Sequence, residues 1–379
     1  MSAQISIVKC DNYEPAKVQQ AIRDALGLLG GITNFIKPNS RVLVKPNLLM
    51  SKGPECGITT HPQIVRAIIQ ILKEINCKVV VGDGPSVWGG YIENVDEVYG
   101  VTGIKKVCQD EDVRLVNFDK RRMRDKFPLT AQLDECDHLI NLPKFKTHEL
   151  TLITGAIKNL FGLVSGTYKT ELHKNYFAPA EFAKILVDIY QEAKPDLTII
   201  DGILAMEGDG PATSGIPREL GLLLCGADCV ALDTIVAKIM GIKQEVLTTK
   251  EAALRNLGQA WLDKIKIEGE NIDRLNIRPF ILPKNSVKLT TLPPIITKIF
   301  KSLVRYYPYS LRLKCTRCGH CVKVCPKQCI RLSAMFYGGK KSGIQINYHQ
   351  CIACFCCQEA CPEAAIGVRK SLLAKLIGL

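Results

Sequence analysis

The C-terminal part of the chain contains the stretch CTRCGHCVKVCP at residues 315–326, and its spacing returns as CIACFCCQEACP at residues 351–362. In each stretch three cysteines follow one another at intervals of three residues, and a fourth comes four residues later, directly before a proline. Eight of the 17 cysteines of the chain belong to this pattern. Two copies of one set of four thiolates predict two metal centres of the same kind.

The pattern Cys-x-x-Cys-x-x-Cys-x-x-x-Cys-Pro is the ligand spacing of bacterial ferredoxins that carry two 4Fe-4S clusters. In such proteins the fourth cysteine of each motif binds the cluster held by the other motif. The spacing therefore predicts one cluster bound by Cys315, Cys318, Cys321 and Cys361, and a second bound by Cys351, Cys354, Cys357 and Cys325. Since such clusters exchange single electrons, we expect an electron-transfer protein.

Zinc and disulfide bonds are the alternative uses of these cysteines. A structural zinc site takes four ligands in two pairs, which leaves half of the eight cysteines unexplained. A disulfide framework of this density is typical of a short secreted domain. Cys329 and Cys356 stand inside the motifs but outside the ligand spacing. We interpret them as packing residues, and an alternative ligand or a redox-active spare thiol is the other interpretation.

Length and composition indicate more than a small electron carrier. The chain has 379 residues, 47% of them hydrophobic, which is enough for two or three domains with their own core. The first residues show no apolar run after a basic head, and no stretch of about 18 residues lacks charges. We therefore expect neither a signal peptide nor a membrane span. Scattered free cysteines suit a reducing compartment, so we expect a cytoplasmic protein.

The formal net charge of +13 is concentrated near the C-terminus. From Pro294 onward, 14 lysines and arginines stand against Glu359 and Glu363, a net charge of +12 within 86 residues. The other 293 residues carry 36 basic and 35 acidic side chains and are nearly neutral. An oxidised 4Fe-4S cluster with four thiolates carries a net negative charge, so part of the basic excess compensates the clusters.

The same basic excess bears on the partners of the protein. It favours docking of an acidic electron carrier, such as a soluble ferredoxin or flavodoxin. Nucleic acid is disfavoured, because aromatic residues for stacking are few and no recognition motif occurs. Integral membrane association is disfavoured because no apolar span is present.

Short apolar segments alternate with helical patterns over the first 240 residues. Strands are predicted at 41–45, 78–81, 113–116, 138–142, 197–201 and 220–224. Helices are predicted at 16–29, 62–75, 101–109, 151–163, 180–192 and 228–240. This alternation predicts an α/β fold with a mostly parallel sheet and helices on both faces. Functional loops are then expected beyond the C-terminal ends of the strands.

We expect four segments along the chain. An α/β domain covers residues 1–277, a Pro-rich basic connector 278–311, a small α+β ferredoxin-like domain with two 4Fe-4S clusters 312–367, and an amphipathic tail 368–379. Residues 295–305 of the connector and the tail could each form an amphipathic helix that packs on the protein or lies on a membrane surface. Packing on the protein is the interpretation that we prefer.

Polar residues follow four of the predicted strands, and Lys158 stands on an otherwise apolar helical segment. We predict that an anionic substrate is bound by a group of basic and amide side chains, namely Lys45, Asn47, Lys144, Lys146 and Lys158. Protons would come from His148, Asp83 or Asp209. These acids, with Asp201 and Glu207, could instead hold a divalent metal in the α/β domain.

Gly-Asp-Gly-Pro occurs twice, at residues 82–85 and 208–211. Glycine permits positive φ and close approach of a ligand, although an ordinary turn is the simpler interpretation of either copy alone. Neither copy is a Walker A loop, and no GxGxxG motif occurs. A nucleotide therefore has no support from motifs.

Five ordered segments carry a resemblance to a known family: VLVKPNLL (42–49), VVVGDGPS (79–86), LINLPKFKTH (139–148), ITGAIKNLFG (153–162) and LTIIDGILAMEGDGP (197–211). Followed by a two-cluster ferredoxin part, they resemble the family catalogued as domain of unknown function 362, which occurs in iron-sulfur proteins of bacteria and archaea. The resemblance covers roughly residues 5–245 and 312–367. It implies an association with 4Fe-4S clusters and assigns no substrate.

Three functions are compatible with these features. The first is an iron-sulfur oxidoreductase that passes low-potential electrons through two clusters to an anionic substrate in the α/β domain. The second is a non-catalytic electron-transfer subunit whose α/β domain recognises a partner enzyme. The third is a ligand-binding protein whose clusters sense redox state. We prefer the first, although no flavin, nicotinamide or radical motif is visible in the sequence.

Overall fold

The computed structural model describes residues 3–84, 87–88, 91–92, 94–166, 168–176, 178–284, 306–333, 336–337, 340–341 and 343–370. The helix predicted at 295–305 lies outside the described residues, as do most of the predicted connector and residues 371–379 of the predicted tail. The four predicted segment boundaries stay predictions.

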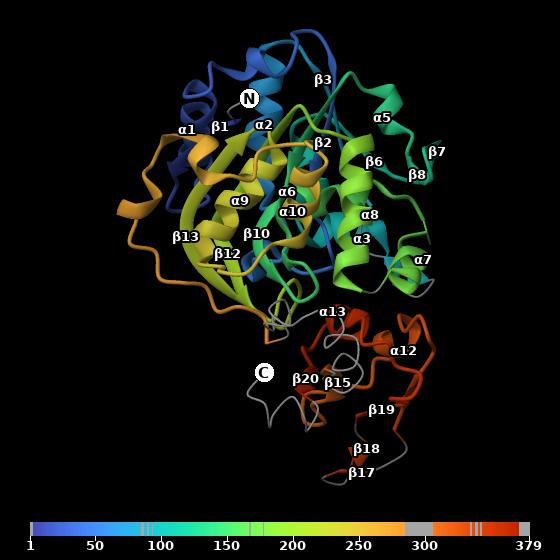
Figure 1. The fold of residues 1–379 in the computed structure, drawn as a ribbon. Coiled ribbons are helices and arrows are strands. Elements are labelled where there is room, and N and C mark those ends of the chain that lie inside the picture. Colours follow the sequence, from blue (N-terminus) through green and yellow to red (C-terminus); the bar gives the residue numbers. More distant parts are fainter. Residues whose placement is uncertain are drawn as a thin grey trace.

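A ten-stranded sheet forms the centre of the N-terminal part (Figure 1). Eight of its strands lie in the order β14 (Ile265–Gly269), β1 (Ala3–Lys9), β13 (Gly215–Gly226), β12 (Leu197–Gly208), β9 (His138–Leu142), β2 (Arg41–Pro46), β3 (Lys78–Asp83) and β6 (Arg114–Asn117). The strands from β12 to β6 are parallel, whereas β13 is antiparallel to both of its neighbours. The predicted mostly parallel sheet is confirmed.

Helices cover both faces of this sheet (Figure 1). One face packs against α1 (Pro15–Gly27), α2 (Pro62–Glu74), α3 (Val95–Val101) and α4 (Ile104–Asp110). The other packs against α6 (Gly155–Asn159), α8 (Pro179–Glu192), α9 (Cys229–Met240) and α10 (Leu247–Leu254). Within β2, Val42 and Val44 face the first group while Leu43 faces the second. Burial on both faces explains why the strands are continuous apolar runs in the sequence.

The smaller elements of this part complete the chain path. They are β4 (Val87–Trp88), β5 (Tyr91–Ile92), β7 (Arg121–Arg124), β8 (Phe127–Thr130), α5 (Gln132–Glu135), β10 (Lys144–His148), β11 (Leu152–Ile153) and α7 (Tyr168–Asn175). β4 pairs with β5 and β7 with β8 as antiparallel ribbons outside the central sheet. β10 pairs with β12 and β11 and so extends the central sheet beyond the end of β9.

Two segments predicted as loops are strands. Residues 144–148 form β10, which is parallel to β12 and buried throughout. β12 does not end at Asp201 but continues to Gly208, with a bulge between Gly202 and Leu204. Lysine is uncommon in strands, and two lysines in a strand that is buried throughout are unexpected. They are accommodated because oxygen atoms from other elements accept their hydrogen bonds.

The helix predicted at 151–163 is shorter than expected. β11 occupies its first residues, α6 begins at Gly155, and a 3-10 turn follows from Leu160 to Leu163. Gly155 has a φ of 60°, which ends the extended segment. The carboxylate of Asp233 then accepts hydrogen bonds from the amides of Ala156 and Ile157. A side chain distant in sequence therefore fixes the start of this helix.

The C-terminal part is a small unit of short helices and two-stranded antiparallel sheets. Its elements are β15 (Tyr306–Ser310), α12 (His320–Lys323), β16 (Ile330–Leu332), β17 (Phe336–Tyr337), β18 (Lys340–Lys341), β19 (Ile344–Ile346), α13 (Cys356–Glu359) and β20 (Ile366–Lys370). β15 pairs with β20, β16 with β19 and β17 with β18. This is the predicted small α+β unit, whose core consists mainly of cysteines and a few aliphatic side chains.

The C-terminal unit lies beyond the C-terminal ends of the parallel strands, with α13 facing the α/β part (Figure 1). Leu49, which follows β2, packs against the cysteine-rich core of the small unit. The hydroxyl of Thr213 donates a 2.6 Å hydrogen bond to the carbonyl of Cys361. The strand ends, where functional residues were expected, therefore meet the metal-binding unit directly.

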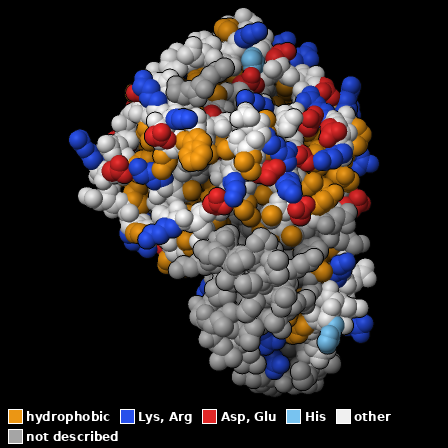
Figure 2. All heavy atoms as spheres, viewed as in Figure 1, with side chains coloured by type: hydrophobic (Ala, Val, Ile, Leu, Met, Phe, Trp, Pro, Cys, Tyr) orange, Lys and Arg blue, Asp and Glu red, His pale blue; other side chains and the backbone are white. Residues whose placement is uncertain are grey.

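Charged side chains of both signs are interspersed over the visible face of the α/β part (Figure 2). This distribution agrees with the near balance of acidic and basic residues before Pro294. In the described part of the chain, no helix has the length and apolarity needed to cross a membrane.

Candidate functional site

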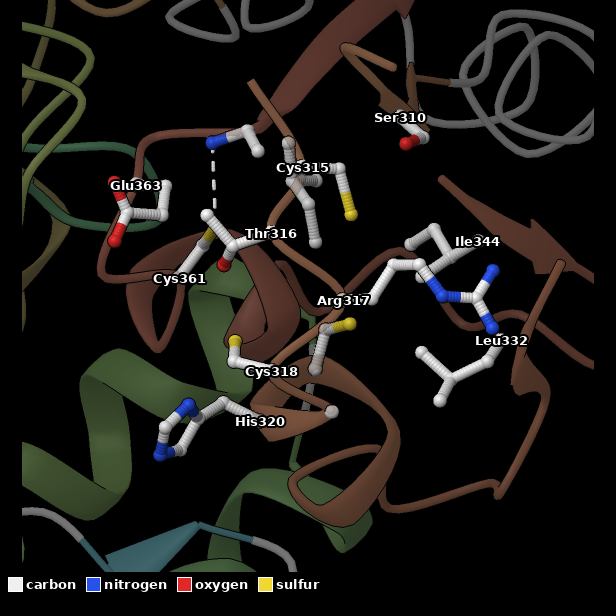
Figure 3. Close-up of a pocket in the computed structure, with 14 residues that line it drawn as sticks. Ser310, Cys315, Thr316, Arg317, Cys318, His320, Leu332, Ile344, Cys361 and Glu363 are labelled. Carbon is white, nitrogen blue, oxygen red and sulfur yellow. Dashed lines mark hydrogen bonds between the residues drawn. The ribbon is translucent and has the colours of Figure 1, made fainter. Parts of the chain in front are cut away.

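The cysteines of the C-terminal unit line two separate cavities. The first is lined by the four cysteines of the first predicted set, Cys315, Cys318, Cys321 and Cys361. In Figure 3 Cys315, Cys318 and Cys361 surround this space together with Arg317 and Ile344. The second cavity is lined by Cys325, Cys351, Cys354 and Cys357, with Cys329 beside them. Each cavity thus combines three cysteines of one motif with the fourth of the other.

The two cavities fit 4Fe-4S clusters in their surroundings as well as in their thiols. Backbone amides donate to the sulfurs: Ala365 to Cys361 at 3.2 Å and Ala353 to Cys351 at 3.4 Å. Hydrogen bonds of this kind stabilise the negative charge of cluster thiolates and tune the reduction potential. Four thiols drawn from both motifs around each cavity are the ligand set that a 4Fe-4S cluster requires.

The two extra cysteines occupy different places. The sulfur of Cys329 lies 3.3 Å from that of Cys325 and lines the second cavity. Cys356 lies at the start of α13, where its thiol is directed to the carbonyl of Cys354 at 4.0 Å. Both side chains are buried. Their interpretation as packing residues stays a prediction.

Lys45 and Asp83 form a buried ion pair at the ends of β2 and β3. Their charged atoms are 2.7 Å apart, and neither side chain is more than 2% exposed. The other oxygen of Asp83 accepts from the amide of Leu48, and Lys45 also donates to Asn159. Asn47 donates to the same oxygen of Asn159 at 2.8 Å. This network joins three of the predicted site residues.

The ion pair lies close to a backbone turn that leaves no room for a side chain. A Cβ atom on Gly162 would lie 2.2 Å from the Asp83 carboxylate and 2.6 Å from the Lys45 ammonium. Only glycine permits this approach. The close approach of the ion pair therefore explains why Gly162, the last residue of the ITGAIKNLFG segment, is a glycine.

A second buried pair connects Lys144 of β10 with Asp201 of β12. Their charged atoms are 2.7 Å apart, and both side chains are fully buried. The hydroxyl of Tyr13 donates to Asp201 and accepts from Lys144, and the ring of His61 stacks on Tyr13 with centroids 3.6 Å apart. Burial lowers the pKa of His61 to about 4, so this imidazole is neutral near pH 7.

Among the described residues of the α/β part, no carboxylate pairs with Lys146 or Lys158. Lys146 is 1% exposed and donates to the carbonyl of Ile58 at 2.6 Å. Burial, together with the positive charges of Lys158 and Lys144, lowers its pKa well below the usual value. Burial also lowers the pKa of Lys158, while Glu359 of α13 acts in the opposite direction. These two lysines therefore form the basic part of the face that meets α13.

The acidic part of this face comes from both units. Glu359 is 8% exposed, and burial raises its pKa to about 7 against the opposing effect of Lys158 and Lys146. Burial and the charge of Glu359 raise the pKa of Glu149 to about 9. His148 directly precedes Glu149 in the sequence, and the Nε2 atom of its imidazole lies 3.7 Å from the carboxylate of Glu359. We call the group Lys146, His148, Glu149, Lys158 and Glu359 the interface cluster.

Asp209 and Glu207 are held by ion pairs of their own. Asp209 pairs with Lys284 at 3.2 Å and accepts from its amide. Glu207 accepts from Arg218 and Arg278 at 2.9 and 2.7 Å. Both acids are therefore engaged in ion pairs, and a divalent metal in the α/β part stays a prediction.

Sequence reasoning assigned no role to several residues of the site. No sequence motif distinguishes Glu149, Glu359, Tyr13 and Lys169 from ordinary polar residues. Lys169 of α7 is 5% exposed, and its ammonium donates to the carbonyls of Gly84 and Gly162 beside the Lys45–Asp83 pair. Burial lowers the pKa of Lys169 to about 7.

The lowered pKa of Lys169 predicts a stability effect with a definite sign. Between roughly pH 7 and 9 the unfolded chain binds a proton at this lysine that the folded protein has released, so its contribution to stability rises with pH. Relative to Lys169→Met, the unsubstituted protein should gain about 2 kcal/mol over this range, measured by chemical denaturation. Lys184→Met, on the exposed face of α8, serves as control and should show no such pH dependence.

Two family models match the chain. One, described as a domain of unknown function (DUF362), matches residues 42–238, and one described as a 4Fe-4S dicluster domain matches residues 314–365. The chain is 35% identical over 264 residues to a protein of Synechocystis sp. named thylakoid-associated protein, which covers 67% of this chain and 80% of the relative. Over 65 residues it is 35% identical to NADH-quinone oxidoreductase subunit I of Pelobacter propionicus, covering 16% of this chain and 35% of the relative. Together with the two cysteine-lined cavities, the dicluster match establishes 4Fe-4S clusters as cofactors and electron transfer as their use.

Proposed function

Since the chain belongs to the family described as domain of unknown function DUF362, we propose its activity from its own side chains: it is an iron-sulfur oxidoreductase acting on a small anionic substrate. The substrate would bind in the α/β part and receive low-potential electrons that pass through both clusters. The observation that carries this proposal is the interface cluster, in which two lysines that pair with no carboxylate among the described α/β residues meet α13. α13 also contains Cys357, which lines the second cavity.

The eight motif cysteines are the proposed cluster ligands, in the crossed sets that line the two cavities. When bound, the clusters supply single electrons. α13 places Cys357 two residues from Glu359, and Glu359 meets Lys158 and His148 of the α/β part. This proximity supports an electron path that ends at the interface cluster.

Lys146 and Lys158 are the proposed anion-binding residues. Lys45 and Lys144 are already neutralised by Asp83 and Asp201, so they position neighbouring groups and hold the strand ends together. Lys146 is buried beside two other lysines, an arrangement that disfavours its protonated form. A bound carboxylate or phosphate would supply the missing negative charge and restore the protonated ammonium. Asn47 would orient this group through Asn159.

His148 is the proposed proton donor. The other two candidates, Asp83 and Asp209, are held in ion pairs with Lys45 and Lys284. His148 is fully buried and lies within 3.7 Å of Glu359. With the pKa of Glu359 raised to about 7, this carboxyl group is able to exchange a proton with the imidazole near neutral pH.

The proposed electron donor is an acidic soluble carrier, a ferredoxin or flavodoxin, in the cytoplasm. The net charge of +12 after Pro294 supports this partner, because complementary charge accelerates association. A non-catalytic electron-transfer subunit is the second candidate. It is favoured by the similarity of a 65-residue segment of the chain to subunit I of an NADH-quinone oxidoreductase.

Binding of oxalate and inorganic phosphate to the cluster-loaded protein tests the proposed substrate site. We expect one of these anions to bind at micromolar to millimolar concentrations and to lose about tenfold in affinity in Lys158→Gln, measured by calorimetry. Lys105→Gln, an exposed lysine of α4 on the other face of the sheet, is the matched control and should bind as before.

Absence of binding for both anions, or equal losses in the two variants, would remove the support for an oxidoreductase. The electron-transfer subunit would then be the better account.

A further inference from the structure

The C-terminal unit contains a third hollow, separate from both cysteine-lined cavities. It measures about 670 Å³ and opens to solvent between β15, β16, β19 and the residues that follow β19. This volume lies within the range of about 300–1,000 Å³ that small-molecule and cofactor sites occupy. The hollow is therefore large enough for an organic ligand.

The charged side chains that line this hollow are all positive. Arg312, Arg331 and Arg369 belong to its lining, and none of the lining residues is an aspartate or glutamate. A guanidinium stays charged at all relevant pH values and presents a planar set of donors that matches a phosphate or carboxylate. Three such groups around one hollow favour an anion with two or more negative charges.

The remaining lining is suited to an organic body rather than to a bare ion. Tyr309 and Tyr348 contribute aromatic rings, and the guanidinium of Arg369 lies 5.0 Å from the centroid of the Tyr348 ring. The Oγ atom of Ser310 is buried and has no hydrogen-bond partner among the described residues. A ligand hydroxyl or phosphate oxygen could satisfy it.

The hollow adjoins both cysteine-lined cavities. It shares Cys329 with the second cavity, and the sulfur of Cys329 lies 3.3 Å from that of Cys325. It shares Ser310 and Ile344 with the first cavity. A molecule bound here would therefore lie beside both clusters, on elements that do not take part in the interface cluster.

We propose that this hollow is a binding site for a phosphorylated organic anion of about mononucleotide size. Arg331 and Arg369 hold the phosphate, and the tyrosine rings pack against the organic part. The site is independent of the proposed substrate site, because it is built from β15, β16, β19 and β20 and not from the lysines of the α/β part.

The test uses the cluster-loaded protein and two probes, flavin mononucleotide and adenosine monophosphate. We expect at least one probe to bind at micromolar concentrations, measured by fluorescence quenching or calorimetry, and Arg331→Gln with Arg369→Gln to weaken it at least about tenfold. Binding should also alter the electron paramagnetic resonance spectrum of the reduced clusters, because the site adjoins them. Lys158→Gln should leave probe binding unchanged, which separates this site from the substrate site.

Two results would overturn the proposal. One is the absence of binding of both probes at millimolar concentrations. The other is an arginine-dependent complex with an acidic ferredoxin that neither probe competes for, which would make the hollow part of a protein-docking surface. Loss of oxalate binding in Lys158→Gln has no bearing on either result.

Discussion

Replacing Cys357 by alanine should remove one cluster, so that the iron content of the anaerobically purified protein falls from about eight to about four atoms per chain. Cys357 lines the second cavity with Cys325, Cys351 and Cys354 and is buried in α13. A cluster that is bound by three thiolates instead of four loses iron readily. The first cavity keeps all four of its cysteines. Iron and sulfide analysis, together with electron paramagnetic resonance of the reduced protein, measures this loss.

Cys356 provides a matched control for this prediction. It is the adjacent residue in the same helix, is equally buried, and does not line the second cavity. Cys356→Ala should therefore retain both clusters. The assignment of ligands would be contradicted if Cys356→Ala lost half of the iron and Cys357→Ala kept all of it.

Asp201→Asn should destabilise the protein by about 3–5 kcal/mol, the usual cost of removing one partner of a buried ion pair. The carboxylate of Asp201 is fully buried and accepts hydrogen bonds from Lys144, Tyr13 and the amide of His61. The substitution leaves the ammonium of Lys144 without a counter-charge and turns an amide NH₂ towards these donors. Chemical denaturation of the cluster-loaded protein gives the change in the free energy of unfolding.

An exposed aspartate separates this effect from the chemical change itself. Asp112 lies in a turn with a φ of 45°, a conformation that asparagine tolerates well, so Asp112→Asn should change stability by less than about 0.5 kcal/mol. If Asp201→Asn changed the free energy of unfolding as little as Asp112→Asn, water would have to solvate the Lys144–Asp201 pair. The buried network would then not be what stabilises this part of the fold.

The sequence was sufficient to predict the metal-binding unit and the general form of the sheet. Cysteine spacing is a local property, and the pairing of each motif with the last cysteine of the other follows from it. The parallel strands were visible because burial on both faces produces continuous apolar runs such as RVLV at 41–44. The expectation that strand ends carry the functional residues also agrees with the position of the C-terminal unit.

The polar contacts could not be predicted in the same way. Tyr13 meets Leu204 and Asp201 across about half of the chain, and nothing near Tyr13 in sequence distinguishes it from a surface tyrosine. β10 looked like a loop because KFKTH contains two lysines whose partners lie in other elements. Propensity treats such lysines as solvated, whereas the tertiary structure buries them.

Glu359 shows a further limit of sequence reasoning. It lies within the second cysteine motif, where it was counted only as one of two acids in a basic region. Its role arises from the docking of α13 on the α/β part, which brings it to Lys158, Lys146 and His148. Contacts between two segments that are distant in sequence leave no periodic signal in either of them.

The central claim is that an anion binds at the interface cluster within reach of the second 4Fe-4S cluster. Electron–nuclear double resonance of the dithionite-reduced protein with isotopically labelled oxalate tests it most directly. At an oxalate concentration below saturation, we predict a coupling between the label and the reduced cluster that is equally strong in the unsubstituted protein and in Lys105→Gln, and much weaker in Lys158→Gln. A spectrum without such a coupling, although calorimetry shows that oxalate is bound, would place the anion away from the cluster and contradict the account.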